Sequence, residues 1–383
     1  MKHSFGLFLL LLGCVAPAKE PAPPNPAPSE KVRVPVSDPR VRSTGRVDHT
    51  DPNVARFAYP GVTFELAFEG ETVTVELDDA SKADPKHSNH YQVLVDGAPA
   101  LDLAVTPGVH EYTLASGLAP GSHRVALYKK TEAFVGSGAF RSFSVLGKGP
   151  KALDLPARPA RRLEFVGDSI TCGYGNEATI DAPPAGNPST GFTAENEDHY
   201  RSYDALAARA LGAELHATCI SGIGVTRDYG GKTSDQMPVL FGRTLPFEAE
   251  PAWDFAAYTP DAVIVNLGTN DFGQGVPDQA GFERAYDAFL GDLRRHYPNA
   301  HLACLTGPMF TNSWPAGEER LTKINQWVGG AVERRKAQGD TRISFLALAP
   351  QAPPFGEDWH PSLATHARMA GEVEHHLREK LGW

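Results

Sequence analysis

The sequence lacks the features that would place it inside a membrane or on a nucleic acid. The apolar run at residues 7–12 is too short to cross a bilayer, and no later segment is apolar enough to do so. No basic stripe is present, and a formal charge of −10 speaks against a nucleic-acid partner. The 41% hydrophobic and 21% charged fractions are ordinary for a folded protein. At 383 residues the chain is long enough for two domains.

The N-terminal residues predict export from the cytoplasm. Lys2 and His3 precede the apolar run, as in a signal peptide. The run ends in Leu-Leu-Gly-Cys, which resembles a bacterial lipobox, so residues 1–13 are expected to be removed and Cys14 to carry the lipid. The competing interpretation is ordinary secretion after cleavage behind Ala18, in the Ala-Pro-Ala segment. A lipid at Cys14 is the membrane contact that the sequence predicts.

Cysteine is scarce, with four residues in the chain. The three apart from Cys14 are Cys172, Cys219 and Cys304, and an odd number in an exported protein allows at most one internal disulfide. We interpret these three as structural thiols, because none of them fits a nucleophile motif. Whether Cys172 pairs with Cys219 stays open.

The composition divides the chain into segments. Residues 14–31 are rich in proline and alanine and predict an extended linker. In residues 32–148 apolar side chains alternate with polar ones, as in Val62, Phe64 and Leu66, and turn signals such as Asp96-Gly97 separate the runs. This pattern is typical of an antiparallel β-sandwich, whose role is left open between packing and sugar binding. Residues 149–161 contain prolines and predict a connector.

Residues 162–383 follow a different period. Apolar runs at 163–166, 214–219, 262–267, 301–305 and 343–348 alternate with helical patterns. One helix face carries Phe282, Tyr286 and Phe289, and another carries Ile324 and Trp327. Five strands alternating with helices predict a doubly wound, flavodoxin-like α/β domain with a mainly parallel sheet.

Four short segments follow predicted strands and together contain the groups needed for ester hydrolysis: residues 167–171, 221–224, 268–271 and 358–361. Ligands of parallel sheets bind beyond the carboxyl ends of the strands, so these segments are expected to meet at one edge. Ser169 is the predicted nucleophile, although a serine there could instead cap a helix. His360 is the predicted general base.

The remaining site residues are predicted from their chemistry. Gly222, the side chain of Asn270 and the amide of Ser169 would donate hydrogen bonds to an oxyanion, with Gly224 as the alternative glycine. Asp168 is expected to brace the turn beside Ser169. The acid that orients His360 is expected to be Asp358, with Glu357 as the alternative. Trp359 is expected either to form a flat wall for a sugar ring or to lie in the core.

These motifs resemble the SGNH (GDSL-like) hydrolase superfamily, to whose Ser, Gly, Asn and His the residues Ser169, Gly222, Asn270 and His360 correspond. The longer strings at residues 164–177, 44–48 and 128–132 look like carbohydrate esterase family two. That resemblance covers nearly all residues from about 32 to 383. It implies a jelly-roll domain joined to an SGNH hydrolase domain, and removal of acetyl groups from polysaccharides such as xylan or glucomannan without a metal or cofactor.

The expected function is therefore a serine esterase acting on acetylated polysaccharides. Two alternatives remain at this stage. The chain could be a surface protein that binds polysaccharide without cleaving it, or an esterase that acts on acetylated peptidoglycan or on lipid esters. Intact serine, asparagine and histidine favour catalysis over binding alone.

Overall fold

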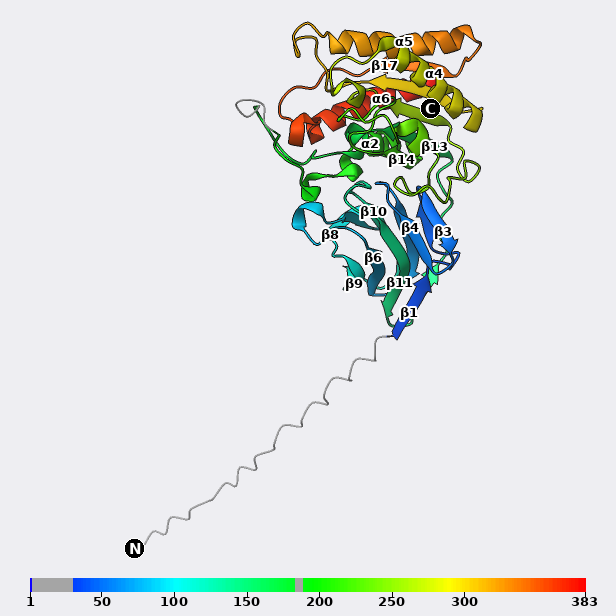
Figure 1. The fold of residues 1–383 in the computed structure, drawn as a ribbon. Coiled ribbons are helices and arrows are strands. Elements are labelled where there is room, and N and C mark those ends of the chain that lie inside the picture. Colours follow the sequence, from blue (N-terminus) through cyan, green and yellow to red (C-terminus); the bar gives the residue numbers. More distant parts are fainter. Residues whose placement is uncertain (2–29, 183–188) are drawn as a thin grey trace.

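The computed structural model describes residue 1 and residues 30–182 and 189–383. The predicted lipidation residue Cys14, the alternative cleavage site behind Ala18 and all of the predicted signal peptide except Met1 lie outside the described residues. Among the described residues, no helix is both long enough and apolar enough to span a bilayer. The fold consists of a β-sandwich followed by an α/β domain, and the two are stacked in Figure 1.

The β-sandwich consists of two antiparallel sheets of six strands each. The first has the order β3-β4-β11-β6-β9, with β1 also paired to β11. Its strands are β1 (Glu30–Pro35), β3 (Val47–Asp51), β4 (Val54–Phe57), β6 (Thr72–Asp79), β9 (Gly108–Ala115) and β11 (Gly138–Gly147). The second has the order β12-β5-β10-β7-β8, with β2 paired to β5. Its strands are β2 (Arg42–Thr44), β5 (Thr63–Glu69), β7 (His90–Val95), β8 (Ala98–Ala104), β10 (Ser122–Lys129) and β12 (Lys151–Leu153).

The predicted alternation of side chains is confirmed in this domain. Val62, Phe64 and Leu66 are buried in the core between the sheets. Asp96 and Gly97 connect β7 to β8 with φ angles of 53° and 83°, the left-handed values of a two-residue type I′ hairpin turn. The turn signal at Asp96-Gly97 therefore correctly marks the boundary between β7 and β8.

The sandwich extends beyond its predicted limits at both ends. Strand β1 begins at Glu30, inside the predicted linker. Strand β12 lies within the predicted connector, residues 149–161, and pairs antiparallel with β5. The prolines that suggested a connector, Pro150 and Pro156, flank β12 and do not interrupt it. A proline is tolerated beside β12 because this strand lies at the edge of its sheet.

The α/β domain contains a parallel sheet of five strands in the order β14-β13-β15-β16-β17, which confirms the predicted strands. They are β13 (Arg161–Gly167), β14 (Ala213–Cys219), β15 (Ala262–Asn266), β16 (His301–Thr306) and β17 (Ile343–Ala347). The described helices are α1 (Ser169–Cys172), α2 (Tyr203–Leu211), α3 (Met237–Leu240), α4 (Gln279–His296), α5 (Arg320–Ala337) and α6 (Leu363–Leu381). Short 3₁₀ helices are η1 (Pro85–His87), η2 (Ala194–Asn196), η3 (His199–Arg201), η4 (Asn270–Phe272) and η5 (Glu357–Trp359).

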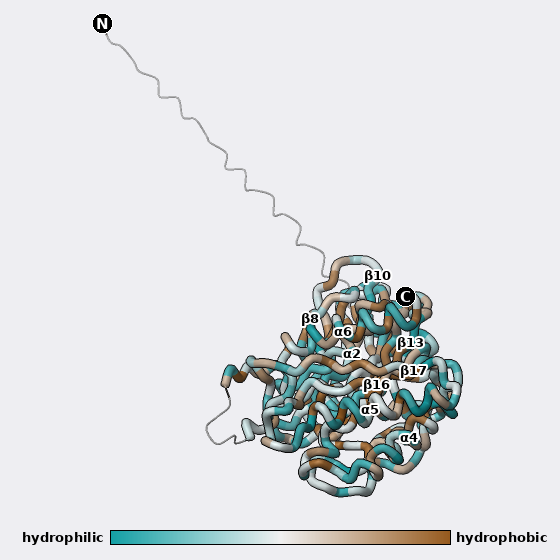
Figure 2. The backbone as a smooth tube through the Cα atoms, turned by 90° about the horizontal axis from the view of Figure 1, so that it is seen from above, coloured by the Kyte–Doolittle hydropathy of each residue, from teal (hydrophilic) through white to brown (hydrophobic). Residues whose placement is uncertain are grey.

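Helices cover both faces of this sheet. Val263 and Val265 of β15 pack in one core with residues of α4 and α5. Ala262 and Ile264 of the same strand pack in a second core with residues of α2 and α6. Such a strand is buried on both faces and is apolar throughout, as expected of a central parallel strand. Figure 2 shows hydrophilic and hydrophobic stretches alternating along α4 and α5, as expected of helices with one face on a core.

The sandwich and the α/β domain share buried contacts. Ile220 and Leu240 of the α/β domain belong to the core of the sandwich. Arg46 and Glu164, both fully buried, form an ion pair of 2.8 Å between the domains. The hydroxyl oxygen of Tyr128 in β10 lies 2.5 Å from the Nδ1 atom of His199. The two domains therefore form one packed body, and groups of the sandwich lie beside the sheet edge where the predicted site is found.

Candidate active site

The strand register brings three of the four predicted segments to one edge of the parallel sheet. Gly167 at the end of β13 lies opposite Cys219 of β14 and Asn266 of β15. Ser169 follows β13 by two residues, and Gly222 and Asn270 follow β14 and β15 by three and four. The sheet therefore brings these residues to a common edge, as the sequence predicted.

Ser169 and His360 meet at this edge, although 191 positions separate them in the sequence. The Oγ atom of Ser169 lies 2.7 Å from the Nε2 atom of His360. Ser169 is the first residue of the short helix α1, and the helix cap is Asp168, whose Oδ1 accepts a hydrogen bond of 3.0 Å from the amide of Ile170. Because Asp168 does the capping, the hydroxyl of Ser169 is available to His360.

The histidine is oriented by a backbone carbonyl. The Nδ1 atom of His360 lies 2.9 Å from the carbonyl oxygen of Glu357. A carbonyl can only accept, so Nδ1 carries the proton and Nε2 offers its lone pair to the Ser169 hydroxyl. Burial lowers the pKa of His360 to about 4, which keeps the imidazole neutral and able to accept a proton at ordinary pH.

The expected role of Asp358 is corrected by this geometry. Among the described residues its carboxylate makes no hydrogen bond to His360. It accepts hydrogen bonds from the hydroxyls of Tyr174 (2.9 Å) and Ser189 (2.7 Å) and from the amides of Thr190 (2.7 Å) and Gly191 (3.2 Å). Burial acts to raise the pKa of Asp358, but these hydrogen bonds outweigh it and the net pKa is lowered.

The backbone explains why Asp358 does not reach His360. Asp358 and Trp359 have left-handed φ angles of 48° and 67°, which are uncommon for residues other than glycine. This turn brings the carbonyl of Glu357 to the imidazole and leaves the carboxylate of Asp358 on the loop at residues 189–191. The carboxylate of Glu357 is also engaged elsewhere, by the amide of Thr193 (3.0 Å) and the side chain of Asn196 (2.7 Å). The carboxylates of both predicted acids therefore bind groups other than His360.

Two backbone amides at the site are free to donate. In the described part of the chain, neither the amide of Ser169 nor that of Gly222 donates to another protein group. Gly222 has a φ of 77°, which favours glycine for conformational reasons. The alternative, Gly224, is excluded because its amide already donates to the Oε1 atom of Gln236 at 3.0 Å.

Asn270 is the first residue of η4, and its side chain is held from two sides by residues next to Ser169 and Gly222. Its Nδ2 atom donates to the carbonyl of Ile223 at 3.0 Å and to the Oδ2 atom of Asp168 at 3.2 Å. Burial raises the pKa of Asp168 to about 7. Asp168 therefore braces both α1 and the amide of Asn270, which extends the bracing role predicted for it.

Aromatic rings lie beside the site. Trp359 is partly exposed, with its ring 5.9 Å from that of Phe355, so it is not a core residue. The ring of Tyr174 lies 4.2 Å from the imidazole of His360. Tyr174 was not among the predicted site residues, although it follows Ser169 by five positions within the 164–177 segment.

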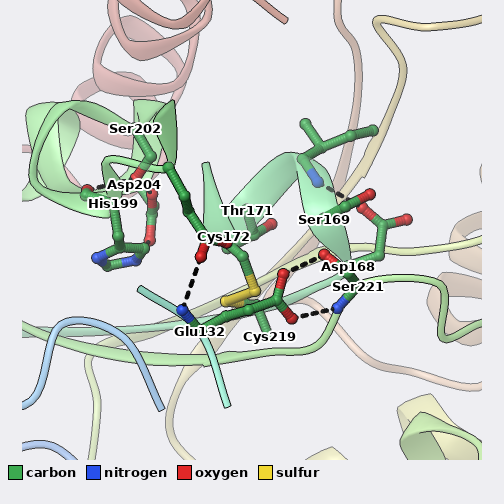
Figure 3. The surroundings of a disulfide bond; sticks show 12 residues. Glu132, Asp168, Ser169, Thr171, Cys172, His199, Ser202, Asp204, Cys219 and Ser221 are labelled. Carbon is green, nitrogen blue, oxygen red and sulfur yellow. Dashed lines mark hydrogen bonds and ion pairs between the residues drawn. A yellow bond between two sulfur atoms is a disulfide. The ribbon is translucent and has the colours of Figure 1, made fainter. Parts of the chain in front are cut away.

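A disulfide bond ties the nucleophile helix to the strand beside it. Cys172 at the end of α1 pairs with Cys219 at the end of β14, with Cα atoms 5.6 Å apart (Figure 3). Cys304 is a free, buried thiol, and burial raises its pKa to about 12. The disulfide settles the pairing that the sequence left open. Within residues 30–182 and 189–383, no group of three or more His, Cys, Asp or Glu is arranged to hold a metal ion.

Comparisons with protein families and relatives agree with this architecture. Residues 43–156 match the carbohydrate esterase 2 N-terminal family, and residues 165–368 match the GDSL-like lipase/acylhydrolase family. The chain is 37% identical over 348 residues to the cellulase/esterase CelE of Acetivibrio thermocellus. This match covers 90% of the chain but only 40% of CelE.

A second relative is matched over most of its length. It is an acetylxylan esterase / glucomannan deacetylase of Cellvibrio japonicus, 28% identical over 349 residues, which are 91% of this chain and 90% of the relative. Among solved structures, a family two carbohydrate esterase from Clostridium thermocellum in complex with cellohexaose superimposes with a TM-score of 0.81. It is 36% identical, and the match covers 90% of this chain and 99% of that one. The chain therefore belongs to carbohydrate esterase family two.

Proposed function

We propose that this chain is a serine esterase that removes O-acetyl groups from polysaccharides of the acetylated xylan or glucomannan type. The observation that carries the proposal is the 2.7 Å contact between the Oγ atom of Ser169 and the Nε2 atom of His360, beside two free backbone amides. A serine hydroxyl needs such a base to become a nucleophile. The amides of Ser169 and Gly222 and the side chain of Asn270 then act as the oxyanion hole.

In the first half of the reaction the acetyl group moves to the enzyme. The Oγ atom of Ser169 forms a bond to the acetyl carbon while the Nε2 atom of His360 takes its proton. The carbonyl of Glu357 accepts from Nδ1 and stabilises the imidazolium that forms. The side-chain amide of Asn270 gives up the longer of its two hydrogen bonds, that to Asp168, and donates to the oxyanion. The bond from carbon to the sugar oxygen then breaks, and His360 returns the proton to the leaving hydroxyl.

In the second half water releases acetate. His360 takes a proton from water as the water oxygen attacks the acetyl carbon on Ser169. The bond between this carbon and Oγ breaks, and the proton on His360 returns to the serine oxygen. Within residues 30–182 and 189–383 no carboxylate hydrogen-bonds to His360, so the working pair is Ser169 and His360, with the carbonyl of Glu357 behind the imidazole.

The substrate class is inferred from the site and from the names of the relatives. Trp359 is partly exposed next to His360 and offers a flat apolar face for a sugar ring. The relatives include an acetylxylan esterase / glucomannan deacetylase and an esterase solved with cellohexaose. These observations favour plant-type polysaccharides such as acetylated xylan or glucomannan over acetylated peptidoglycan or lipid esters.

Acetate release tests the proposal directly. Wild-type protein and Ser169→Ala are incubated with acetylated xylan, acetylated glucomannan and acetylated peptidoglycan, and acetate is measured together with glycan affinity. We expect release from the plant-type polymers by the wild type, and a loss of at least about 10³-fold in folded Ser169→Ala. Binding without acetate release by the wild type would identify a binding protein, and preference for peptidoglycan would overturn the substrate class.

For the location of the protein we propose export as a bacterial lipoprotein anchored at Cys14, with secretion after cleavage behind Ala18 as the alternative. The lipobox-like segment at residues 11–14 supports the anchor. Metabolic labelling with a fatty acid tests it. We expect label on the wild type and none on Cys14→Ser, whereas an unlabelled wild-type protein that starts after residue 18 would favour secretion.

A further inference from the structure

Glu132 of the β-sandwich contacts the α/β domain at residues 220–224, the loop after β14 that contains Gly222. We call this segment the oxyanion loop. It lies between β10 and β11, and its Oε2 atom accepts a hydrogen bond of 2.7 Å from the amide of Ser221. Its Oε1 atom accepts a second hydrogen bond from the hydroxyl of the same serine. Figure 3 shows this carboxylate facing Ser221 next to the Cys172–Cys219 disulfide. One carboxylate thus holds both the main chain and the side chain of one residue.

Ser221 directly precedes Gly222, whose free amide is assigned to the oxyanion hole. Gly222 has no side chain to anchor it, and a Cβ placed on it would find no atom within 4 Å. Its position therefore depends on hydrogen bonds of its own backbone and of the residue before it. The carbonyl of Gly222 accepts a hydrogen bond of 2.8 Å from the amide of Tyr229, and the preceding residue, Ser221, is held by Glu132.

Glu132 is itself held firmly. It is fully buried, and its own amide donates to the Oε2 atom of Glu197 at 3.0 Å. Its carbonyl accepts a hydrogen bond of 3.2 Å from the Nζ atom of Lys129, which is buried at the end of β10. Burial of a carboxylate destabilises the fold unless the carboxylate is hydrogen-bonded, and the carboxylate of Glu132 accepts its hydrogen bonds from Ser221.

We propose that Glu132 is a positioning residue for catalysis, which fixes the amide of Gly222 through Ser221 and makes the β-sandwich part of the oxyanion hole. This inference rests on the proposed function, because it requires Gly222 to act as an oxyanion donor. It assigns the sandwich a role in turnover that neither packing nor sugar binding describes.

Other contacts between the domains provide the matched control. Arg158 joins the same two domains through Glu214 (2.7 Å) and the carbonyl of Ser43 (2.8 Å), but neither partner is next to the site. Removing Arg158 loosens the boundary without touching the oxyanion loop. An effect that is specific to Glu132 therefore separates positioning from simple attachment of the domains.

The test compares Glu132→Ala, Glu132→Asp, Glu132→Gln and Arg158→Ala in the full chain. Asp retains the charge but withdraws the carboxylate by one methylene, whereas Gln retains the length and can still accept from the amide of Ser221. Complete loss of an oxyanion donor costs ~10²–10³ in rate, so we expect kcat to fall about 10- to 100-fold in the Ala and Asp variants. KM is expected to stay within about threefold, because the displaced donor acts on the transition state.

The other readouts decide between positioning and stability. We expect weaker inhibition of the Ala and Asp variants by methylboronic acid, whose tetrahedral serine adduct resembles the intermediate. We expect kcat within about threefold of wild type for Glu132→Gln and Arg158→Ala. Unchanged kcat in Glu132→Asp, or an equal loss in Glu132→Gln, overturns the proposal. If Glu132→Ala does not fold, the Asp and Gln pair decides.

Ser169→Ala and Asn270→Ala separate failure of this inference from failure of the proposed function. Retained acetate release in folded Ser169→Ala would overturn the proposed mechanism, whereas retained activity in Asn270→Ala would remove only Asn270 from the oxyanion hole. A strong loss in Asn270→Ala together with unaffected Glu132 variants would overturn only the role of Glu132.

Discussion

The imidazole of His360 is held by the main chain of Glu357, with 2.9 Å between Nδ1 and the carbonyl oxygen. A carbonyl fixes the tautomer and the ring orientation as a carboxylate does, but it carries no full charge to stabilise the imidazolium. Desolvation of the half-buried imidazole lowers the pKa of His360 to about 4, so the base works in its neutral form. Two consecutive left-handed residues, Asp358 and Trp359, create this geometry.

Replacing Asp358 with asparagine tests whether a carboxylate belongs to the catalytic machinery. Asparagine can still accept hydrogen bonds from the loop at residues 189–191, so we expect kcat to fall by less than about tenfold. In triads whose carboxylate orients the histidine, the same change costs about 10⁴-fold. The measurement is kcat on an acetylated polysaccharide, with Glu357→Gln as the control, for which we expect an equally small effect. A loss near 10⁴-fold in Asp358→Asn alone would restore Asp358 as the orienting acid.

The pH profile follows from the pKa of His360. Only the neutral imidazole can take the proton of Ser169, and its pKa of about 4 lies below the ordinary value of 6.5. We therefore expect kcat/KM to stay high as the pH falls below 6.5 and to decline only as it approaches 4. The lowered pKa of His360 also makes the free energy of unfolding depend on pH. Since the unfolded chain binds the proton more readily, the contribution of His360 to stability is lost as the pH falls from 6.5 towards 4. An acid limb centred near 6.5 would contradict the lowered pKa of His360.

The disulfide between Cys172 and Cys219 is expected to matter for stability and for turnover. It closes a loop of 47 residues, for which the chain-entropy model gives about 4 kcal/mol. It also joins the helix of Ser169 to the strand that precedes Gly222. Cys172→Ala/Cys219→Ala is expected to lower the free energy of unfolding in urea by about 2–4 kcal/mol and to reduce kcat. Cys304→Ala, which leaves the disulfide intact, is the control. If kcat of the double variant equals that of Cys304→Ala, the disulfide has no part in ordering the site.

The buried ion pair between Arg46 and Glu164 provides a test of the domain boundary. Arg46→Met leaves the Glu164 carboxylate buried without its partner, and such a loss costs about 3–5 kcal/mol. Arg46→Met/Glu164→Leu removes both charges, so we expect it to recover much of this loss. Thermal unfolding of the full chain measures both variants. A double variant no more stable than Arg46→Met would show that the pair contributes more than mutual neutralisation.

Much of the site could be predicted from sequence because parallel sheets impose a rule. Ser169, Gly222 and Asn270 each follow an apolar strand, and adjacent parallel strands end at the same edge. The inner strands β15 and β16 are visible as apolar runs because every residue in them is buried, as expected of central parallel strands. The short strand β12 was missed, because its three residues lie between prolines and carry little periodic signal.

The orienting group behind His360 could not be read from residue types. A carboxylate two or three positions before a histidine is a reasonable candidate, but the left-handed turn at Asp358 presents a carbonyl in its place. Backbone carbonyls are the same in every residue, so no side-chain pattern identifies the one that will be used. The contact between the rings of Tyr174 and His360, 4.2 Å apart, is likewise not indicated by residue types.

The two-part fold, the nucleophile and base candidates, and the sheet edge where they meet follow from the amino-acid pattern alone, since periodicity and strand order are local properties of the chain. The group that orients His360, the pairing of the cysteines and the contact between Glu132 and Ser221 became apparent only in the folded chain. The carbonyl that orients His360 lies three residues before it and is positioned by the left-handed turn at Asp358 and Trp359. The parallel register of β13 and β14 brings Cys172 to Cys219, 47 positions away, and packing of the sandwich against the α/β domain brings Glu132 to Ser221, 89 positions away.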